Sequence, residues 1–134
     1  MITFVQPTKI LLTLWLSLLF SACMAQPIIG NYPSKEQIAA MEIDGIGAAI
    51  EDYILQVHSP PPLENRLLFR TLDGQNAKRL HFLSTEYMRK NPEGEIVDPW
   101  GSPYRIRSAD GMIVVSSANC RYTRRIKLNS VGER

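Results

Sequence analysis

The stretch Asp98 to Ile106, with the sequence DPWGSPYRI, is the most informative stretch of the chain. Pro99 biases Asp98 toward an extended backbone, and the short Asp98 carboxylate can accept hydrogen bonds from backbone N–H groups two or three residues further on. Pro99 also presets the second position of a turn, and Gly101 supplies the permissive backbone that closes it. The stretch therefore predicts a tight turn in which Trp100 is a buried apolar anchor and Asp98 has a structural role.

A small antiparallel sheet is predicted after this turn. Pro103 cannot donate to a β-ladder, so we expect a strand to start at Tyr104, at a strand end or sheet edge, with Tyr104 and Ile106 on one face. The segments 104–108 and 112–117 flank Ala109-Asp110-Gly111, which has the turn chemistry of a hairpin. Residues 124–128 add a third strand.

Two helices are predicted before the turn. Ser34 and Gln37 match a capping box, and apolar residues at helical spacing continue to Val57. The apolar positions of this helix, expected over 35–57, are Ile38, Met41, Ile46, Ile50, Tyr53, Ile54 and Val57. Gly45 and Gly47 each cost about 1 kcal/mol relative to Ala, which indicates a kink or close packing against the sheet.

After three prolines at 60–62, the leucines Leu63, Leu67, Leu68 and Leu72, followed by Asp73-Gly74, predict a second, shorter helix. Residues 75–97 carry loop signals. The predicted class is α+β, with a long N-terminal amphipathic helix packed on a small antiparallel sheet of about three strands.

A signal peptide is predicted at the N-terminus. Lys9 precedes the eleven residues Ile10 to Phe20, which are too few to span a bilayer and suit a signal-peptide apolar region. Two processing sites follow. The sequence FSAC ending at Cys23 resembles a lipobox, which would make Cys23 a lipid-modified N-terminus, whereas cleavage after Ala25 would release a soluble protein. The lipoprotein site is favoured.

The expected organisation is a signal peptide over 1–22, a tether over 23–33 and a globular domain over 34–134. We expect an exported protein that is periplasmic, either anchored in the membrane through Cys23 or soluble. Because both processing routes consume or remove Cys23, Cys120 is left without a partner and is expected to be a buried small residue.

Positive charge gathers late in the chain. The formal net charge is +2, but residues from 105 onward hold seven Lys or Arg against two acids. The segment Arg121 to Lys127, RYTRRIK, places basic residues around an aromatic side chain, which is a pattern of nucleic-acid binding. Export makes a nucleic-acid partner improbable, and we predict none.

Candidate catalytic residues are few. His58 and His81 stand alone in the sequence, and Ser116-Ser117 lies in a strand pattern without a nucleophile elbow. We therefore predict no catalytic residue and a non-enzymatic protein. The alternatives are a small periplasmic enzyme and an exported interaction module with no secretion role.

The order of these parts resembles the globular domain of the major pseudopilin of type II secretion systems, over roughly residues 36–118. The motif that carries the resemblance is DPWGSPY, in which Asp98, Pro99, Trp100, Gly101, Pro103 and Tyr104 match. The resemblance implies a pseudopilin-like head, a structural or accessory role in type II secretion or a pilus-like envelope system, and envelope proteins as partners, including secretion-system components.

This chain departs from the family in two places. Pro27, Gly30 and Pro33 occupy the position of the apolar N-terminal helix that forms the filament core. The segment corresponding to the family's calcium loop, 116–125, reads SSANCRYTRR and has no carboxylate. Calcium requires hard oxygen ligands, usually including carboxylates. We therefore predict no metal and no cofactor.

Overall fold

The computed structural model describes residues 30–128. The predicted signal peptide, Cys23 and the first part of the predicted tether lie outside the described residues. The chain divides into two units, Met1–Tyr32 and Pro33–Arg134, and the fold below is that of the second unit. Within residues 30–128, neither helix has the length and apolar character that crossing a membrane requires.

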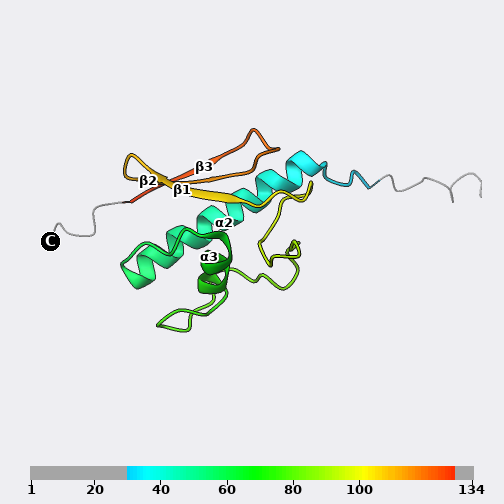
Figure 1. The fold of residues 1–134 in the computed structure, drawn as a ribbon. Coiled ribbons are helices and arrows are strands. Elements are labelled where there is room, and N and C mark those ends of the chain that lie inside the picture. Colours follow the sequence, from blue (N-terminus) through cyan, green and yellow to red (C-terminus); the bar gives the residue numbers. More distant parts are fainter. Residues whose placement is uncertain (1–29, 129–134) are drawn as a thin grey trace, which may run out of the picture. The chain divides into compact units, whose positions relative to one another are not determined.

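Within residues 33–128 this unit contains two helices and a three-stranded antiparallel sheet, which confirms the α+β class (Figure 1). In chain order they are α2 (Lys35–Val57), α3 (Asn65–Leu72), β1 (Arg105–Ala109), β2 (Met112–Ser116) and β3 (Arg124–Lys127). The strand order is β1-β2-β3, so β2 is central and both other strands are edges. The strand bounds lie within one residue of those that the sequence predicts.

The capping box at the start of α2 forms as predicted. The Gln37 N–H donates to Ser34 Oγ at 3.2 Å, and the Ser34 N–H donates to Gln37 Oε1 at 2.8 Å. The helix ends at His58, which has a left-handed backbone (φ 60°) and donates its N–H to the Ile54 carbonyl. The prolines that follow prevent the helix from continuing.

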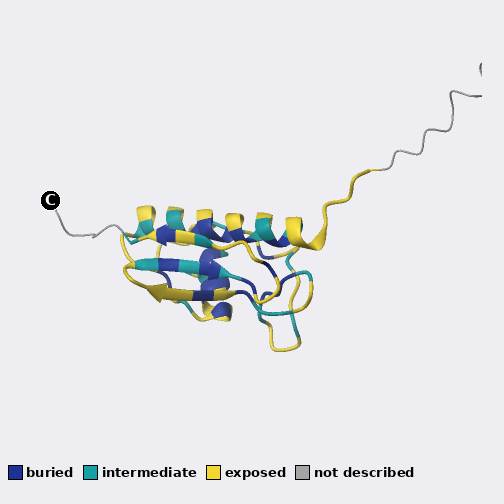
Figure 2. Cartoon of the chain, turned by 90° about the horizontal axis from the view of Figure 1, so that it is seen from above, coloured by how far each residue is buried: buried dark blue, intermediate teal, exposed yellow. Residues whose placement is uncertain are grey.

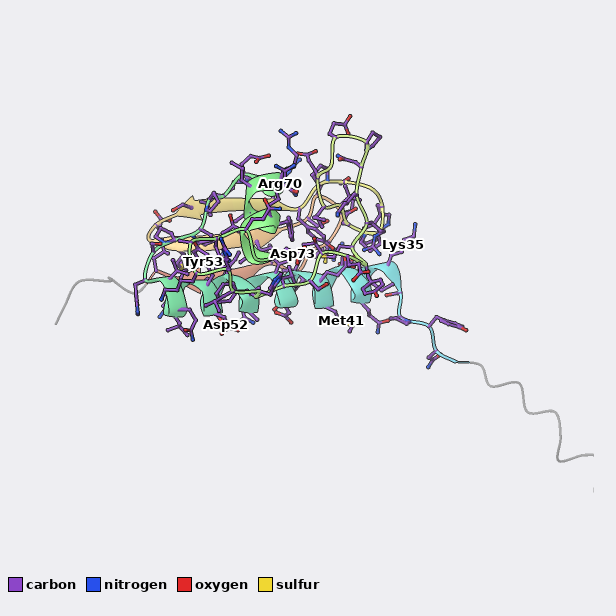
Figure 3. All side chains as sticks on the ribbon, turned by 90° about the horizontal axis from the view of Figure 1, so that it is seen from below. Lys35, Met41, Asp52, Tyr53, Arg70 and Asp73 are labelled. Atoms are coloured by element: carbon purple, nitrogen blue, oxygen red, sulfur yellow. The ribbon has the colours of Figure 1, made fainter. Side chains whose placement is uncertain are left out.

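One face of α2 packs into the core. Its buried residues are Ala39, Ile43, Ile46, Gly47, Ala49, Ile50 and Tyr53. Met41 was expected on this face, but its side chain is 69 % exposed and lies on the opposite side of the helix, as does Asp52 (Figure 3). Small Ala39 and Ala49 occupy the buried positions instead, which lets the helix approach the sheet closely.

The second helix starts later than predicted. Leu63 precedes it, and the Glu64 carboxylate caps it by accepting hydrogen bonds from the Arg66 and Leu67 N–H groups. Leu67, predicted on the core face, is 51 % exposed. The buried residues of α3 are Asn65, Leu68, Phe69 and Leu72.

The β1–β2 hairpin closes through Asp110-Gly111. Both residues have positive φ, 53° and 70°, and Ala109 pairs directly with Met112. This is a two-residue type I′ turn, in which Asp-Gly is a favoured sequence because its twist matches that of the strands. The predicted hairpin is therefore present.

The inner face of the sheet is apolar. It carries Ile106, Ile113, Val115 and Ile126, all buried, while their strand neighbours are exposed or half-buried (Figure 2). Helix α2 covers this face and lies closest to β3. Tyr104 and Ile106 are both buried, as the alternation predicts.

The segment between α3 and β1 has no regular element and is held by side chains. Asn65 is the main support: its Nδ2 donates to the carbonyls of Ile96 and Tyr104 at 3.0 Å each, and its Oδ1 accepts from the Ile96 N–H at 2.8 Å. These bonds position the strip that leads into the turn at Asp98.

Candidate functional site

The turn at Asp98 forms around a buried carboxylate. Asp98 is fully buried, and its Oδ1 accepts the N–H groups of Trp100 and Ser102 at 2.9 Å each. The Gly101 N–H donates to the Asp98 carbonyl at 3.0 Å, and Gly101 has the positive φ, 91°, that makes glycine suitable there. The predicted turn is therefore present, with bonds to positions two and four rather than two and three.

The second carboxylate oxygen reaches another segment. Asp98 Oδ2 accepts from Ser117 Oγ and, at 3.2 Å, from Asn119 Nδ2. Asn119 Nδ2 also lies 2.9 Å from Ser102 Oγ. We call Asp98, Ser102, Ser117 and Asn119 the Asp98 clamp, because these side chains fasten the turn before β1 to the loop after β2.

Ionisation of the Asp98 carboxyl is favoured although the side chain is buried. Burial alone raises the pKa of this carboxyl, but the hydrogen bonds from Ser117, Ser102, Asn119 and Trp100 together outweigh burial and hold the pKa below its ordinary value. The carboxylate is thus charged and fully engaged by four donors. A carboxylate in this state is a structural acceptor, because no lone pair remains for a substrate proton.

Trp100 is not the buried anchor that the sequence predicts. Its side chain is 40 % exposed, so the predicted burial is wrong. On α2, Tyr53 meets Phe82 edge to face, with ring centroids 5.5 Å apart. The core position near the turn belongs to Tyr104, which is 2 % exposed.

Tyr104 ties the turn to α2 through Glu42. The Tyr104 hydroxyl donates to Glu42, and Arg89 Nη2 lies 2.6 Å from both Glu42 oxygens. Burial first, and then the Glu42 carboxylate, raise the pKa of Tyr104, so this phenol remains a proton donor. Glu42 lies on α2, Arg89 in the long loop between α3 and β1, and Tyr104 directly before β1.

The loop after β2 is pinned to α2 by acids of the helix. The Arg121 N–H donates to Glu36 at 3.1 Å, and the Tyr122 hydroxyl donates to Asp44 at 2.6 Å. Arg124 pairs with Asp44 at 3.2 Å and with Glu51 at 3.1 Å. Much of the charge imbalance along the sequence is therefore compensated within the fold.

The candidate catalytic residues are not brought together. His58 is the exposed cap of α2, and the His81 side chain is 73 % exposed, with its nearest acid, Asp73, at 3.6 Å. Ser117 gives its hydroxyl to Asp98, and Ser116 lies 3.5 Å from the Arg105 carbonyl. Cys120 is buried as predicted, and burial raises the pKa of its thiol.

The sequence predicts no metal site, and within residues 30–128 no three His, Cys, Asp or Glu side chains gather as metal ligands. The predicted absence of a metal stays a prediction. The carboxylates that reach the 116–125 segment, Asp98 and the α2 acids Glu36, Asp44 and Glu51, all come from earlier segments, and sequence spacing could not reveal these contacts.

Sequence reasoning also missed Ser117 and Asn119 as partners of Asp98. They lie 19 and 21 residues after it, in a stretch whose polar residues have no distinguishing pattern.

Comparison with protein-family models, with curated proteins and with solved structures gave no match.

Proposed function

We propose that this chain is an exported, non-enzymatic, pseudopilin-like domain that serves as a structural or accessory component of a type II secretion or pilus-like envelope system. The observation that carries the proposal is the Asp98 clamp. In the motif that resembles the pseudopilin family, the Asp98 carboxylate accepts four hydrogen bonds, and these bonds hold the turn before β1 to the loop after β2. The arrangement of a long helix on a three-stranded antiparallel sheet also supports a pseudopilin-like head.

The expected location follows from the predicted leader. In this proposal Cys23 carries a lipid anchor, or cleavage after Ala25 releases a soluble periplasmic form, and the domain meets protein partners of the cell envelope. The domain needs no metal, cofactor or nucleic acid for this role.

The proposal is tested by cross-linking in the native envelope. A tagged full chain at its natural expression level should cross-link to a protein that mass spectrometry identifies as a secretion or pilus component. Deleting its gene should reduce export of proteins that use that system. Normal export in the deletion strain, together with no cross-link to any such component, would reject the secretion role.

An enzymatic alternative has a different signature. If Asp98 worked on a substrate, Asp98→Asn would abolish an activity while a variant of the exposed Trp100 with the same loss of stability would retain it. The clamp geometry instead predicts that any loss of function tracks loss of folded protein.

A further inference from the structure

The outer edge of β3 has backbone groups that the sheet does not use. The Leu128 N–H donates to the Gly111 carbonyl at 3.0 Å, across the direct continuation of the β2–β3 register. In an antiparallel ladder, the backbone N–H and C=O groups of successive residues point alternately toward the neighbouring strand and away from it. Since the backbone groups of Leu128 point toward β2, those of Ile126 do too. The backbone N–H and C=O of Arg125 and Lys127 therefore point outward from the sheet.

These outward groups have no other partner within residues 30–128. None of the turn, loop or side-chain hydrogen bonds of that range involves the backbone of Arg125 or Lys127. An edge with unpaired donors and acceptors is a template for pairing with a further extended segment.

An open cavity lies beside this edge. It has a volume of about 570 Å³ and is formed by the last turns of α2 and by β3. Ile54, Leu55 and His58 contribute from the helix, and Leu55 is 67 % exposed. No residue of β2 lines the cavity, so the cavity opens on the outer side of β3.

The side chains of this edge carry positive charge without compensation. Arg125 and Lys127 are exposed on the outer face of the sheet, and neither forms an ion pair among the described residues. Their neighbour Arg124 points to the inner face, where it pairs with Asp44 and Glu51. Glu51, the one acid that lines the cavity, is therefore already neutralised.

We propose that the β3 edge binds an extended acidic segment of another protein, which adds to the sheet as a fourth strand. Side chains of such a segment alternate between the two faces. Those opposite Arg125 and Lys127 would lie on the outer face and should be acidic. The one opposite Ile126 would point toward α2 and should be apolar, because Ile54 and Leu55 line the cavity there.

This alternation of acidic and apolar residues defines the partner. In strand addition, main-chain hydrogen bonds supply affinity, and pockets for alternate side chains supply specificity. The inference goes beyond the proposed secretion role and does not depend on it.

Two other occupants are disfavoured, a second copy by charge and single-stranded nucleic acid by the lack of aromatic side chains on the outer face of the sheet. A second copy pairing through its own β3 would place Arg125 and Lys127 of both copies side by side, and like charges on neighbouring strands are destabilising. Single-stranded nucleic acid prefers aromatic stacking platforms. The outer face of the sheet carries none, since its residues are Arg105, Arg107, Ala109, Met112, Val114, Ser116, Arg125 and Lys127.

The test uses amide hydrogen exchange of the isotopically labelled full chain, followed by NMR. The probe is a blocked seven-residue peptide in which glutamate and leucine alternate. It should slow exchange at the amides of Arg125 and Lys127, which face outward, and leave Ile126 nearly unchanged because that amide is already in the ladder. A peptide in which lysine replaces glutamate should give no protection.

Two variants separate the backbone and charge contributions. Arg125→Pro removes an outward N–H that the sheet does not use, so the fold should survive and peptide binding should be lost. Lys127→Glu should weaken binding about tenfold. Arg107→Glu changes the net charge equally but lies on the opposite edge strand, so its effect should be less than about twofold.

Every other result overturns the proposal. Protection without peptide that grows with protein concentration would identify a second copy as the occupant. Protection without peptide that is independent of concentration would identify residues 129–134 or another segment of this chain. Equal binding of acidic and basic peptides, or no protection by either, would show that the edge does not select an acidic strand.

Discussion

At the scale of single residues, the buried Asp98 carboxylate accepts four hydrogen bonds. Its two oxygens accept hydrogen bonds from the turn before β1 and from the loop after β2. Hydrogen bonds to a charged group contribute about 1.5–3 kcal/mol each when one partner is removed. The burial of Asp98 means that solvent cannot replace a lost donor.

We expect Asp98→Asn to lower the free energy of unfolding by about 2 kcal/mol at neutral pH, since the amide retains one acceptor and turns an NH2 group toward the Ser117 and Asn119 donors. Chemical denaturation measures the change. Ser102→Ala is a matched control, because it keeps the Ser102 N–H bond to Asp98 and should be milder.

The stability of the wild-type protein and that of Asp98→Asn should depend differently on pH. The folded-state pKa of Asp98 is below its ordinary value, so its stabilisation is complete above the unfolded pKa, about 3.9, and is lost as pH falls through the folded-state pKa. The difference in stability between wild type and Asp98→Asn should therefore shrink below about pH 4. A constant difference from pH 7 to pH 2 would contradict the clamp.

Trp100→Ala should have a modest effect. Truncating a fully buried aromatic costs about 3–5 kcal/mol, but Trp100 is 40 % exposed, so we expect about 1 kcal/mol. Tyr104→Ala, which removes a ring at 2 % exposure, should cost several times more in the same denaturation series. Equal losses for both variants would mean that Trp100 is packed after all.

At the scale of elements, the two helix glycines of α2 differ in what surrounds them. A Cβ at Gly45 meets nothing within 4 Å, whereas a Cβ at Gly47 lies 2.5 Å from Arg124 Cγ. Gly47 thus permits the close approach of β3 and the ion pairs of Arg124. Gly45 has no such role in the described fold.

Gly45→Ala should therefore stabilise the protein by about 0.5–1 kcal/mol through helix propensity alone. Gly47→Ala gains the same propensity but displaces Arg124 from Glu51, so it should be neutral or destabilising. Thermal unfolding of the two variants side by side measures the contrast. Equal stabilisation would show that Arg124 moves aside at no cost.

The elements were predictable where their signals are local. Ser34 and Gln37 cap α2, and Asp110-Gly111 closes the hairpin, because in each case neighbouring residues satisfy one another. Contacts between distant segments were not predictable. Asn65 and Ser117 look like ordinary polar residues in the sequence, and the structure alone shows which carbonyl or carboxylate each one meets.

The orientation of apolar side chains was predictable only in part. Met41 and Leu67 fit helical spacing, but the helix phase that buries Ala39 and Leu68 leaves both exposed. Trp100 is a similar case. Its size and apolar character predict burial, but the direction in which the turn points its side chain determines the exposure of that side chain.

At the scale of the whole molecule, acidic and basic segments that are far apart in the sequence lie against each other in the fold. The acids of α2, Glu36, Asp44 and Glu51, meet the basic stretch that follows β2. These pairs are partly exposed, so each contributes about 0–1 kcal/mol. Among residues 30–128, Arg125 and Lys127 of β3 form no ion pair.

The mature chain should lack its predicted signal peptide. Intact mass of membrane and soluble fractions should show an acylated species that begins at Cys23, because the lipobox is the favoured site. Cys23→Ser should abolish acylation and shift the protein to the soluble fraction. An unmodified wild-type chain beginning at Gln26 would establish the alternative cleavage, and retention of residues 1–22 would contradict both routes.

The pairing of Arg124 with Glu51 spans 73 residues, and it has a consequence for how the chain acquires its structure. Helix α2 emerges early in synthesis, but β3, the strand that lies closest to it, is the last one described. Until β3 is made, α3 and β2 cover only part of the apolar face of α2, and contacts of high sequence separation form slowly. The chain should therefore stay unfolded while it is translated, which is the state that an export channel for unfolded polypeptides accepts.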